Sequence, residues 1–139
     1  MAIKIDGDIT IKDGNTDLKK LKELVPVELW SGSSSSGNIT LADSCANYSY
    51  IDVVYMSRVG AYTTSRIYNP NGKMMNLTSG NGEHMEGYYM YNTVELSFSG
   101  TSVTRTHDRL ITIQNNTAPK VGTTVSYYTL TITNIIGYK

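Results

Sequence analysis

The sequence lacks several features that mark common classes of protein. It contains a single cysteine, Cys45, so no disulfide can form within the chain and a disulfide-stapled secreted scaffold is excluded. Its 12 basic and 12 acidic side chains give a formal net charge of zero, which provides no long-range field to attract nucleic acid or anionic lipid. The longest apolar runs, such as Ile51–Met56, are far shorter than the roughly 20 residues that a membrane-spanning helix needs. We therefore expect neither a nucleic-acid partner nor insertion into a membrane.

A pattern of catalytic residues is also missing. The only two histidines lie in the segments Glu83–Glu86 and His107–Asp108. A metal hydrolase needs two histidines at ligand spacing plus a carboxylate, and a nucleophilic enzyme needs a serine or cysteine beside an oriented histidine. The sequence shows neither arrangement, and Cys45 has no thiol-protease signature around it. We expect a protein that is not an enzyme and that uses no cofactor.

One segment begins like a calcium-binding loop. Asp13–Asp17 has the order Asp-x-Asn-x-Asp. Such a loop also requires a glycine after the third ligand and a bidentate glutamate at its end, but Leu18 and Leu24 occupy those two positions. A turn followed by a helix N-cap explains the same residues, so we expect no metal site.

Residues 1–25 differ in pattern from the rest of the chain. Isoleucines alternate with polar residues on both sides of Asp6-Gly7, which predicts a short strand or hairpin. Leu18, Leu21 and Val25 then recur at i, i+3 and i+7, which predicts a helix of about two turns that ends at Pro26. A helix shorter than roughly 12 to 15 residues is not stable alone in water, so this one needs a partner.

Two partners for this helix are possible. Its leucine stripe is narrow and is flanked by lysine and glutamate, as in the seam of a coiled coil. We therefore favour a short bundle formed with the same segment of sister chains, in which Leu18, Leu21 and Val25 make the oligomer contacts. Docking of the helix on its own chain is the alternative.

Residues 26–139 are predicted to form one all-β domain, an antiparallel β-sandwich of the jelly-roll type. Short segments rich in β-branched and aromatic residues recur with turn residues between them, which is typical of a sandwich or barrel. The clearest alternation is Val94, Leu96 and Phe98 against polar neighbours. No long helical period is present, which excludes a parallel βαβ sheet. The predicted strands are 27–30, 38–41, 50–57, 62–68, 73–77, 86–91, 94–99, 102–107, 109–114 and 126–138.

The connections between these strands are predicted from turn-forming residues. Asn69–Gly72, Ser79–Gly82 and Ser99–Ser102 have the composition of hairpin or loop connections. The serine-rich tract Ser31–Gly37 is predicted to be a flexible loop.

Tyrosine is abundant where phenylalanine is scarce: the chain has 11 tyrosines and one phenylalanine. A tyrosine hydroxyl must meet water or a polar partner, so this excess indicates half-exposed sites, interfaces and ligand surfaces. The densest group, Tyr88–Tyr91, has Tyr89 and Tyr91 on one strand face and Tyr88 on the other. We expect Tyr88, Tyr89, Tyr91 and the nearby His84 to bind a ligand, with sugars as the best fit. Packing of these rings between subunits is the alternative.

Four segments resemble a known group of proteins. They are Leu29-Trp30-Ser31-Gly32, Gly37–Ser44, Asn47–Val53 and Ile132–Lys139. Together they look like the distal β-sandwich domains of tail-fibre and minor structural proteins from phages and prophages of Gram-positive bacteria. The resemblance covers most of residues 27–139, and it supplies no matched ligand residues.

The resemblance implies a virion appendage that is made in the cytoplasm of the bacterial host. Such fibres form trimers through a stem and bind host cell-surface polysaccharide or protein, in contact with other virion proteins. The alternative is a purely structural virion protein such as a capsid fibre, cap or decoration protein. A hydrolase of the receptor polysaccharide would need paired carboxylates across a cleft, and the sequence gives no reason to pair any of its acids.

Overall fold

The computed structural model of the chain describes residues 25–57, 60–85, 88–114, 120–123 and 130–139. The strand and helix predicted before Val25 lie outside these residues, and so do Leu18 and Leu21. Val25 itself is exposed. The structure therefore describes the predicted head domain and not the predicted stem.

The described residues form nine β-strands and one short 3-10 helix, with no α-helix among them. No helix in this part of the chain could therefore cross a membrane. The elements are β1 (Val27–Ser34), β2 (Ile39–Thr40), η1 (Cys45–Asn47), β3 (Tyr50–Met56), β4 (Tyr62–Tyr68), β5 (Met74–Met85), β6 (Tyr88–Ser99), β7 (Ser102–Gln114), β8 (Lys120–Thr123) and β9 (Thr131–Tyr138).

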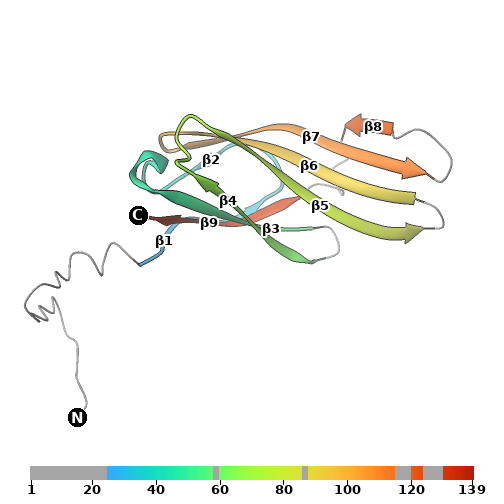
Figure 1. Cartoon of the computed structure of the whole chain (residues 1–139), viewed down its shortest axis with the longest axis horizontal. Coiled ribbons are helices and arrows are strands. Elements are labelled where there is room, and N and C mark those ends of the chain that lie inside the picture. Colours follow the sequence, from blue (N-terminus) through green and yellow to red (C-terminus); the bar gives the residue numbers. More distant parts are fainter. Residues whose placement is uncertain (1–24, 58–59, 86–87, 115–119, 124–129) are drawn as a thin grey trace, which may run out of the picture.

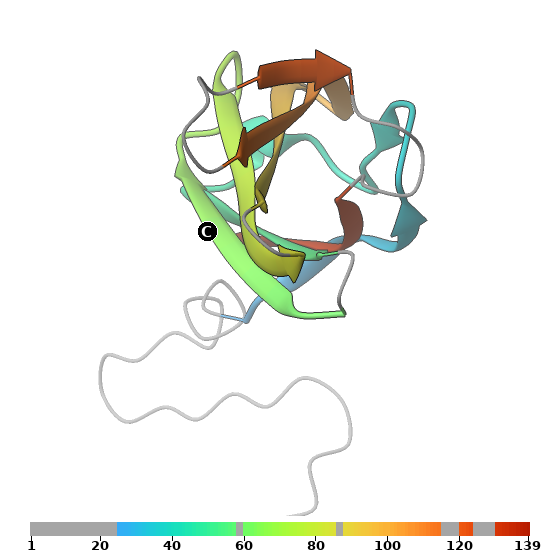
Figure 2. The same cartoon turned by 90° about the vertical axis from the view of Figure 1, so that its right-hand side faces the viewer.

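The strands form two sheets in which every pairing is antiparallel, as expected for a β-sandwich. Sheet A has the order β1-β9-β3-β4. Sheet B has the order β2-β7-β6-β5, and β8 also pairs with β7. Figure 1 shows the two sheets from the side, and Figure 2 shows the strands surrounding the interior when the molecule is seen from its end. The all-β class and the two-sheet architecture predicted from the sequence are confirmed.

The strand connections differ in part from those of a jelly roll. A jelly roll consists of two Greek keys. Here β3 and β4 form a hairpin within sheet A, and β5, β6 and β7 form a meander within sheet B. The chain passes between the sheets from β1 to β2, from β2 to β3, from β4 to β5 and from β8 to β9, because β1, β3, β4 and β9 belong to sheet A and the other strands to sheet B. The jelly-roll expectation is therefore not met in the middle of the chain.

The core lies between the sheets and follows the period-two alternation of the strands. The predicted inward positions Val94, Leu96 and Phe98 are all buried. From sheet A, Ile51 and Val53 on β3 meet them, with Ile132 and Ile135 on β9. The remaining buried apolar residues are Leu29, Ile39, Leu41, Cys45, Tyr48, Tyr55, Ile67, Leu77, Val103 and Leu130.

Several strands are longer than the sequence pattern predicts. Ser79–Gly82 was expected to be a connection, but it lies inside β5, whose pairing with β6 continues at least to Asn81 opposite Met90. Ser31–Gly37 was expected to be a loop, but β1 extends to Ser34 through its pairing with β9. Backbone hydrogen bonds to a neighbouring strand therefore override the turn preference of these polar, small residues.

Two predicted strand breaks are also absent. Residues 88–91 of the predicted strand 86–91 and the predicted strand 94–99 belong to the single strand β6, whereas residues 86 and 87 lie outside the described residues. The predicted strands 102–107 and 109–114 both belong to β7. The apolar pattern of β7 is interrupted because the strand contains a bulge, in which His107 and Asp108 lie opposite Val94. By contrast, the predicted strand 62–68 and the connections at Asn69–Gly72 and Ser99–Ser102 are confirmed.

Candidate functional site

The four residues predicted to bind a ligand lie at one end of sheet B. Tyr88, Tyr89 and Tyr91 are in β6, and His84 is in β5, beside the hairpin that joins these strands at the right of Figure 1. Tyr91 is opposite Ile111 and is 37% exposed. The side chains of Tyr88, Tyr89 and His84 lie outside the described residues. The grouping of these four positions near one hairpin is observed, whereas their role as ligand contacts stays a prediction.

A second group of tyrosines lies on the outer face of sheet A. Tyr50 on β3 is directly opposite Tyr68 on β4 and Tyr138 on β9. The rings of Tyr50 and Tyr138 are stacked, with centroids 4.5 Å apart and planes at 13°. The rings of Tyr50 and Tyr68 are tilted at 49°, with centroids 5.6 Å apart. The three rings therefore form a continuous row across three neighbouring strands.

An ion pair lies alongside this row. Asp52 on β3 is opposite Arg66 on β4. The Arg66 guanidinium donates from Nε to Asp52 Oδ1 at 2.7 Å and from Nη2 to Asp52 Oδ2 at 2.8 Å. Its central carbon lies 4.1 Å from the ring centroid of Tyr50 and 5.6 Å from that of Tyr138. We call these five residues, Tyr50, Asp52, Arg66, Tyr68 and Tyr138, the tyrosine face.

The electrostatics of the tyrosine face follow from these contacts. The hydrogen bonds to Asp52 raise the pKa of Arg66 above its ordinary value, so the guanidinium stays charged. Burial raises the pKa of Tyr138, with a further increase from the negative charge of Asp52. The Tyr138 hydroxyl is therefore protonated at neutral pH, when it can donate and accept hydrogen bonds.

The local sequence explains how this face is formed. In each of the three strands the residues of the face alternate with inward residues, namely Ile51, Ile67 and Gly137. Gly137 is required for a close approach, because a Cβ atom at this position would lie 2.5 Å from Cδ1 of the Tyr48 ring. The buried ring of Tyr48 thus packs directly against the backbone of β9 next to Tyr138.

The rest of the outer face of sheet A combines apolar and polar groups. Tyr62, in the same strand as Tyr68, is 65% exposed, compared with 60% for Tyr68. Half-buried apolar side chains lie nearby on the same side of their strands: Val54, Met56 and Ile136. Glu28 on β1 accepts hydrogen bonds from Ser31 Oγ at 2.8 Å and from Asn134 Nδ2 at 3.3 Å. The face therefore offers flat aromatic rings together with amide, hydroxyl and carboxylate groups.

A small cavity lies beside Tyr48, the residue whose ring packs against Gly137. Its volume is about 190 Å³, below the roughly 300 Å³ at which ligand pockets usually begin. It is lined by Cys45, Ala46, Tyr48, Asn69, Pro70 and Asn71. The Cys45 thiol is buried, which raises its pKa and keeps it protonated at neutral pH. This cavity has the size for a few water molecules and contains no activated nucleophile.

Two of the acid-base residues singled out in the sequence, His107 and Asp108, have structural partners, whereas the side chains of Glu83–Glu86 lie outside the described residues. His107 Nδ1 lies 3.1 Å from Glu95 Oε1, on the exposed side of sheet B. Asp108 is paired with Arg105. Within the part of the chain that the structure describes, no group of three histidine, cysteine or acidic side chains is placed to hold a metal ion.

The tyrosine face was not predicted from the sequence. The strands that contain Tyr50, Tyr68 and Tyr138 were predicted, but they are far apart along the chain and their register cannot be read from the pattern. A usable signal was present in the spacing of Tyr50 with Asp52 and of Arg66 with Tyr68, because each pair is two residues apart and shares one strand face. No protein-family model matches the chain, and a search of curated proteins finds no significant relative.

Proposed function

We propose that this protein is the head of a phage virion appendage and binds a host cell-surface glycan through the tyrosine face. The observation that carries the proposal is the row of Tyr68, Tyr50 and Tyr138 beside the Arg66–Asp52 pair. Tyr50 is covered by Tyr138 and Arg66, so the exposed ring of Tyr68 at the end of the row is the surface on which the C–H face of a sugar can pack. The polar groups beside the row can bind the hydroxyls of the sugar. The virion assignment comes from the sequence resemblance.

The row is well organised for binding before a ligand arrives. Tyr50 is held on one side by Tyr138 and on the other by Tyr68, and Arg66 covers its ring. Because these side chains already occupy defined positions, little rotamer freedom is lost when a ligand packs on them. The exposed ring of Tyr68 at the edge strand is the most accessible of the three contacts.

The proposal includes assembly as a homotrimer through the segment that precedes the head. A single shallow face holds a sugar weakly, and three linked heads can raise overall affinity by roughly 10² to 10⁴ when they engage together. Leu18, Leu21 and Val25 are the proposed oligomer contacts. The exposure of Val25 in the single chain leaves it available for such a contact.

The test compares two tyrosines of strand β4. Tyr68→Ala removes an exposed ring of the row, and Tyr62→Ala removes an equally exposed ring of the same face outside the row. On an array of bacterial wall polymers and oligosaccharides, Tyr68→Ala should weaken binding about tenfold, as expected for loss of an aromatic anchor. Tyr62→Ala should bind like the wild type. Equal binding by both variants and the wild type, or no binding by any of them, would contradict the proposal.

A structural role in the virion is the second candidate, favoured by one specific observation. Exposed Tyr62 and Tyr68 share the outer face of sheet A with half-buried Val54, Met56 and Ile136. Such a face could pack against a neighbouring subunit, since tyrosine and methionine are enriched in the cores of interfaces. On this reading, Tyr62→Ala and Tyr68→Ala would both reduce the mass of the oligomer measured by light scattering. Adsorption to host cells would not change.

A further inference from the structure

The Arg66–Asp52 pair determines which ligands the tyrosine face can accept. Arginine binds carboxylates and phosphates best through two parallel N–H groups on one edge of the guanidinium. In this protein the edge formed by Nε and Nη2 is already occupied by both oxygens of Asp52, at 2.7 and 2.8 Å. An acidic ligand therefore cannot use that edge unless it displaces Asp52. The N–H groups that remain, on Nη1 and the second N–H of Nη2, belong to a guanidinium whose charge Asp52 already neutralises.

The Asp52 carboxylate is held firmly in this position. Its side chain is 9% exposed, whereas that of Arg66 is 42% exposed. Asp52 is also centred in the sheet, because β3 lies between β4 and β9. Displacement would leave a largely buried carboxylate without its cation, which is costly.

The surrounding charges do not favour an acidic ligand either. The pair of Arg66 and Asp52 has no net charge, and Glu28 adds a negative charge on the same face of sheet A. The nearest lysine in sequence, Lys139, is directed elsewhere: its Nζ lies 6.0 Å from the ring centroid of Tyr48, and its charge helps to lower the pKa of Asp43. Lys73 Nζ donates to the backbone oxygen of Tyr68 at 2.9 Å and offsets the charge of Glu28. The charges around the tyrosine face therefore balance, and no excess cation is present to attract an acid.

From this geometry we propose that the tyrosine face selects uncharged sugars over acidic ones, and that Asp52 is the residue that sets this specificity. Asp52 acts in two ways: it occupies the Nε–Nη2 edge of Arg66, and its charge neutralises the guanidinium and repels a ligand carboxylate. The inference rests on the proposed glycan-binding function and adds the class of sugar to it.

The experiment uses an array of neutral oligosaccharides, each paired with its counterpart oxidised to a carboxylate at C6. The wild-type protein should bind the neutral member of a pair about tenfold or more tightly, the difference expected for one hydrogen bond to a charged group. Asp52→Asn keeps the shape of the side chain, removes its charge and frees part of the Arg66 edge. This variant should bind the acidic members at least tenfold better than the wild type does, which abolishes or reverses the preference.

Glu28→Gln is the matched control, because it removes one negative charge from the same face without touching Arg66. It should shift the preference by no more than about twofold, since an exposed charge is screened by salt. A wild-type preference for acidic members would overturn the specificity proposal, and so would an unchanged preference in folded Asp52→Asn. If the wild type and Asp52→Asn bind no member of either kind, glycan binding itself is overturned together with the specificity. The wild-type preference alone tests the proposal if Asp52→Asn does not fold.

Discussion

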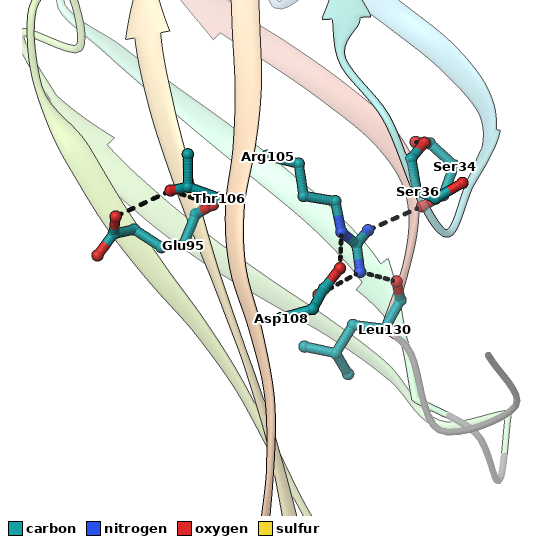
Figure 3. Close-up of polar contacts among 7 residues, drawn as sticks. All are labelled: Ser34, Ser36, Glu95, Arg105, Thr106, Asp108 and Leu130. Atoms are coloured by element: carbon teal, nitrogen blue, oxygen red, sulfur yellow. Dashed lines mark hydrogen bonds and ion pairs between the residues drawn. The ribbon is translucent and has the colours of Figure 1, made fainter. Parts of the chain in front are cut away.

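Arg105 and Asp108 form a two-pronged ion pair although they lie only three residues apart in one β-strand. The Arg105 guanidinium donates from Nε to Oδ2 and from Nη2 to Oδ1 of Asp108, each at 2.8 Å (Figure 3). In a regular strand these two side chains would point to opposite faces. The bulge at His107, whose φ is 46°, brings them to the same side.

Arg105 also connects the two sheets. Its Nη1 donates to the backbone oxygen of Ser34 in β1 at 3.3 Å, and its Nη2 donates to that of Leu130, just before β9, at 3.0 Å (Figure 3). The Arg105 side chain is 3% exposed and that of Asp108 is 28% exposed. A largely buried cation thus joins sheet B to the two neighbouring strands of sheet A.

We predict that Asp108→Ala strongly destabilises the protein. The substitution leaves the Arg105 charge buried without its carboxylate, a change that costs about 3 to 5 kcal/mol in fully buried pairs. Because Asp108 is partly exposed, we expect about 2 to 3 kcal/mol, measured as the free energy of unfolding in urea. Glu28→Ala, which breaks only exposed hydrogen bonds, should change stability by about 0.5 kcal/mol or less. A loss below about 1 kcal/mol for Asp108→Ala would show that the pair contributes little.

The bulge itself predicts an unusual preference at position 107. A positive φ is tolerated by glycine and disfavoured most by β-branched residues. His107→Gly should therefore leave the melting temperature unchanged or raise it, by an amount equivalent to at most about 1 kcal/mol, despite losing the contact with Glu95. His107→Val should lower stability by about 1 to 3 kcal/mol. Equal melting temperatures for the two variants would mean that the strand does not keep this bulge.

A third prediction concerns the contact between Gly137 and Tyr48. Gly137→Ala places a methyl group where the Tyr48 ring lies, so we expect a loss of about 1 to 3 kcal/mol from overpacking. In a Tyr48→Ala background the same substitution should cost much less, because the ring is gone. Chemical denaturation of the four proteins in this double-mutant cycle measures the difference. If the losses of unfolding free energy from the two substitutions simply add, the Tyr48 ring is not what disfavours a side chain at position 137.

Stability should decrease in acid partly through Asp43. Its carboxylate accepts hydrogen bonds from the Ser44 amide at 2.7 Å, from Tyr48 Oη at 3.0 Å and from Asn47 Nδ2 at 3.0 Å. These contacts, the Ser44 amide first, lower the pKa of Asp43 in the folded protein. Its contribution is therefore complete above the ordinary carboxyl pKa of about 4 and is lost as the pH falls from there through the lower folded value.

Thermal melting between pH 2 and pH 6 tests this pH dependence. Asp43→Asn should be less stable than the wild type at pH 6, and the difference should shrink as the pH falls. The pKa of Glu95 is also lowered, chiefly by its hydrogen bond from Thr106, so Glu95 also loses its stabilising effect in acid. This loss is the same in both proteins and cancels in the difference between them. A constant difference between wild type and Asp43→Asn across this range would contradict the assignment.

Cys45 provides a chemical probe of global unfolding. The thiol is buried, and burial raises its pKa, so the reactive thiolate is scarce at neutral pH. We expect the native protein to react with a thiol-specific disulfide reagent at least about 100 times more slowly than the protein in denaturant. Rapid reaction of the folded protein would show that the end of the sandwich near η1 opens easily.

The sequence pattern predicted the parts of the fold that depend on local alternation. Val94, Leu96 and Phe98 point inward as expected, and the predicted strand 62–68 has the same bounds as β4. The pattern failed where pairing between strands decides the conformation. The glycine and asparagine residues of Ser79–Gly82 have turn preferences but lie in β5 opposite β6, and the bulge at His107 shifts the alternation of β7 and so resembles a strand end.

The candidate site was harder to predict for the same reason. The dense group at Tyr88–Tyr91 is visible in the sequence because its members are adjacent, and it drew the prediction of ligand binding. The row of Tyr50, Tyr68 and Tyr138 depends on a register that joins residues 18 and 88 positions apart. Only the assembled sheet reveals these residues as neighbours of Arg66 and Asp52.

The pairing of β1 with β9 places both ends of the described sandwich together, with Val27 opposite Gly137. A purification tag or a fusion partner attached after Lys139 would therefore be adjacent to Tyr138, and one attached just before Val25 would emerge from the same edge of the molecule. Either attachment could shield the aromatic rings from a bulky polymer. Biosensor studies should instead immobilise the protein at the other end of sheet B, near the pair of Met85 and Tyr88, which leaves the outer surface of sheet A open to the solution.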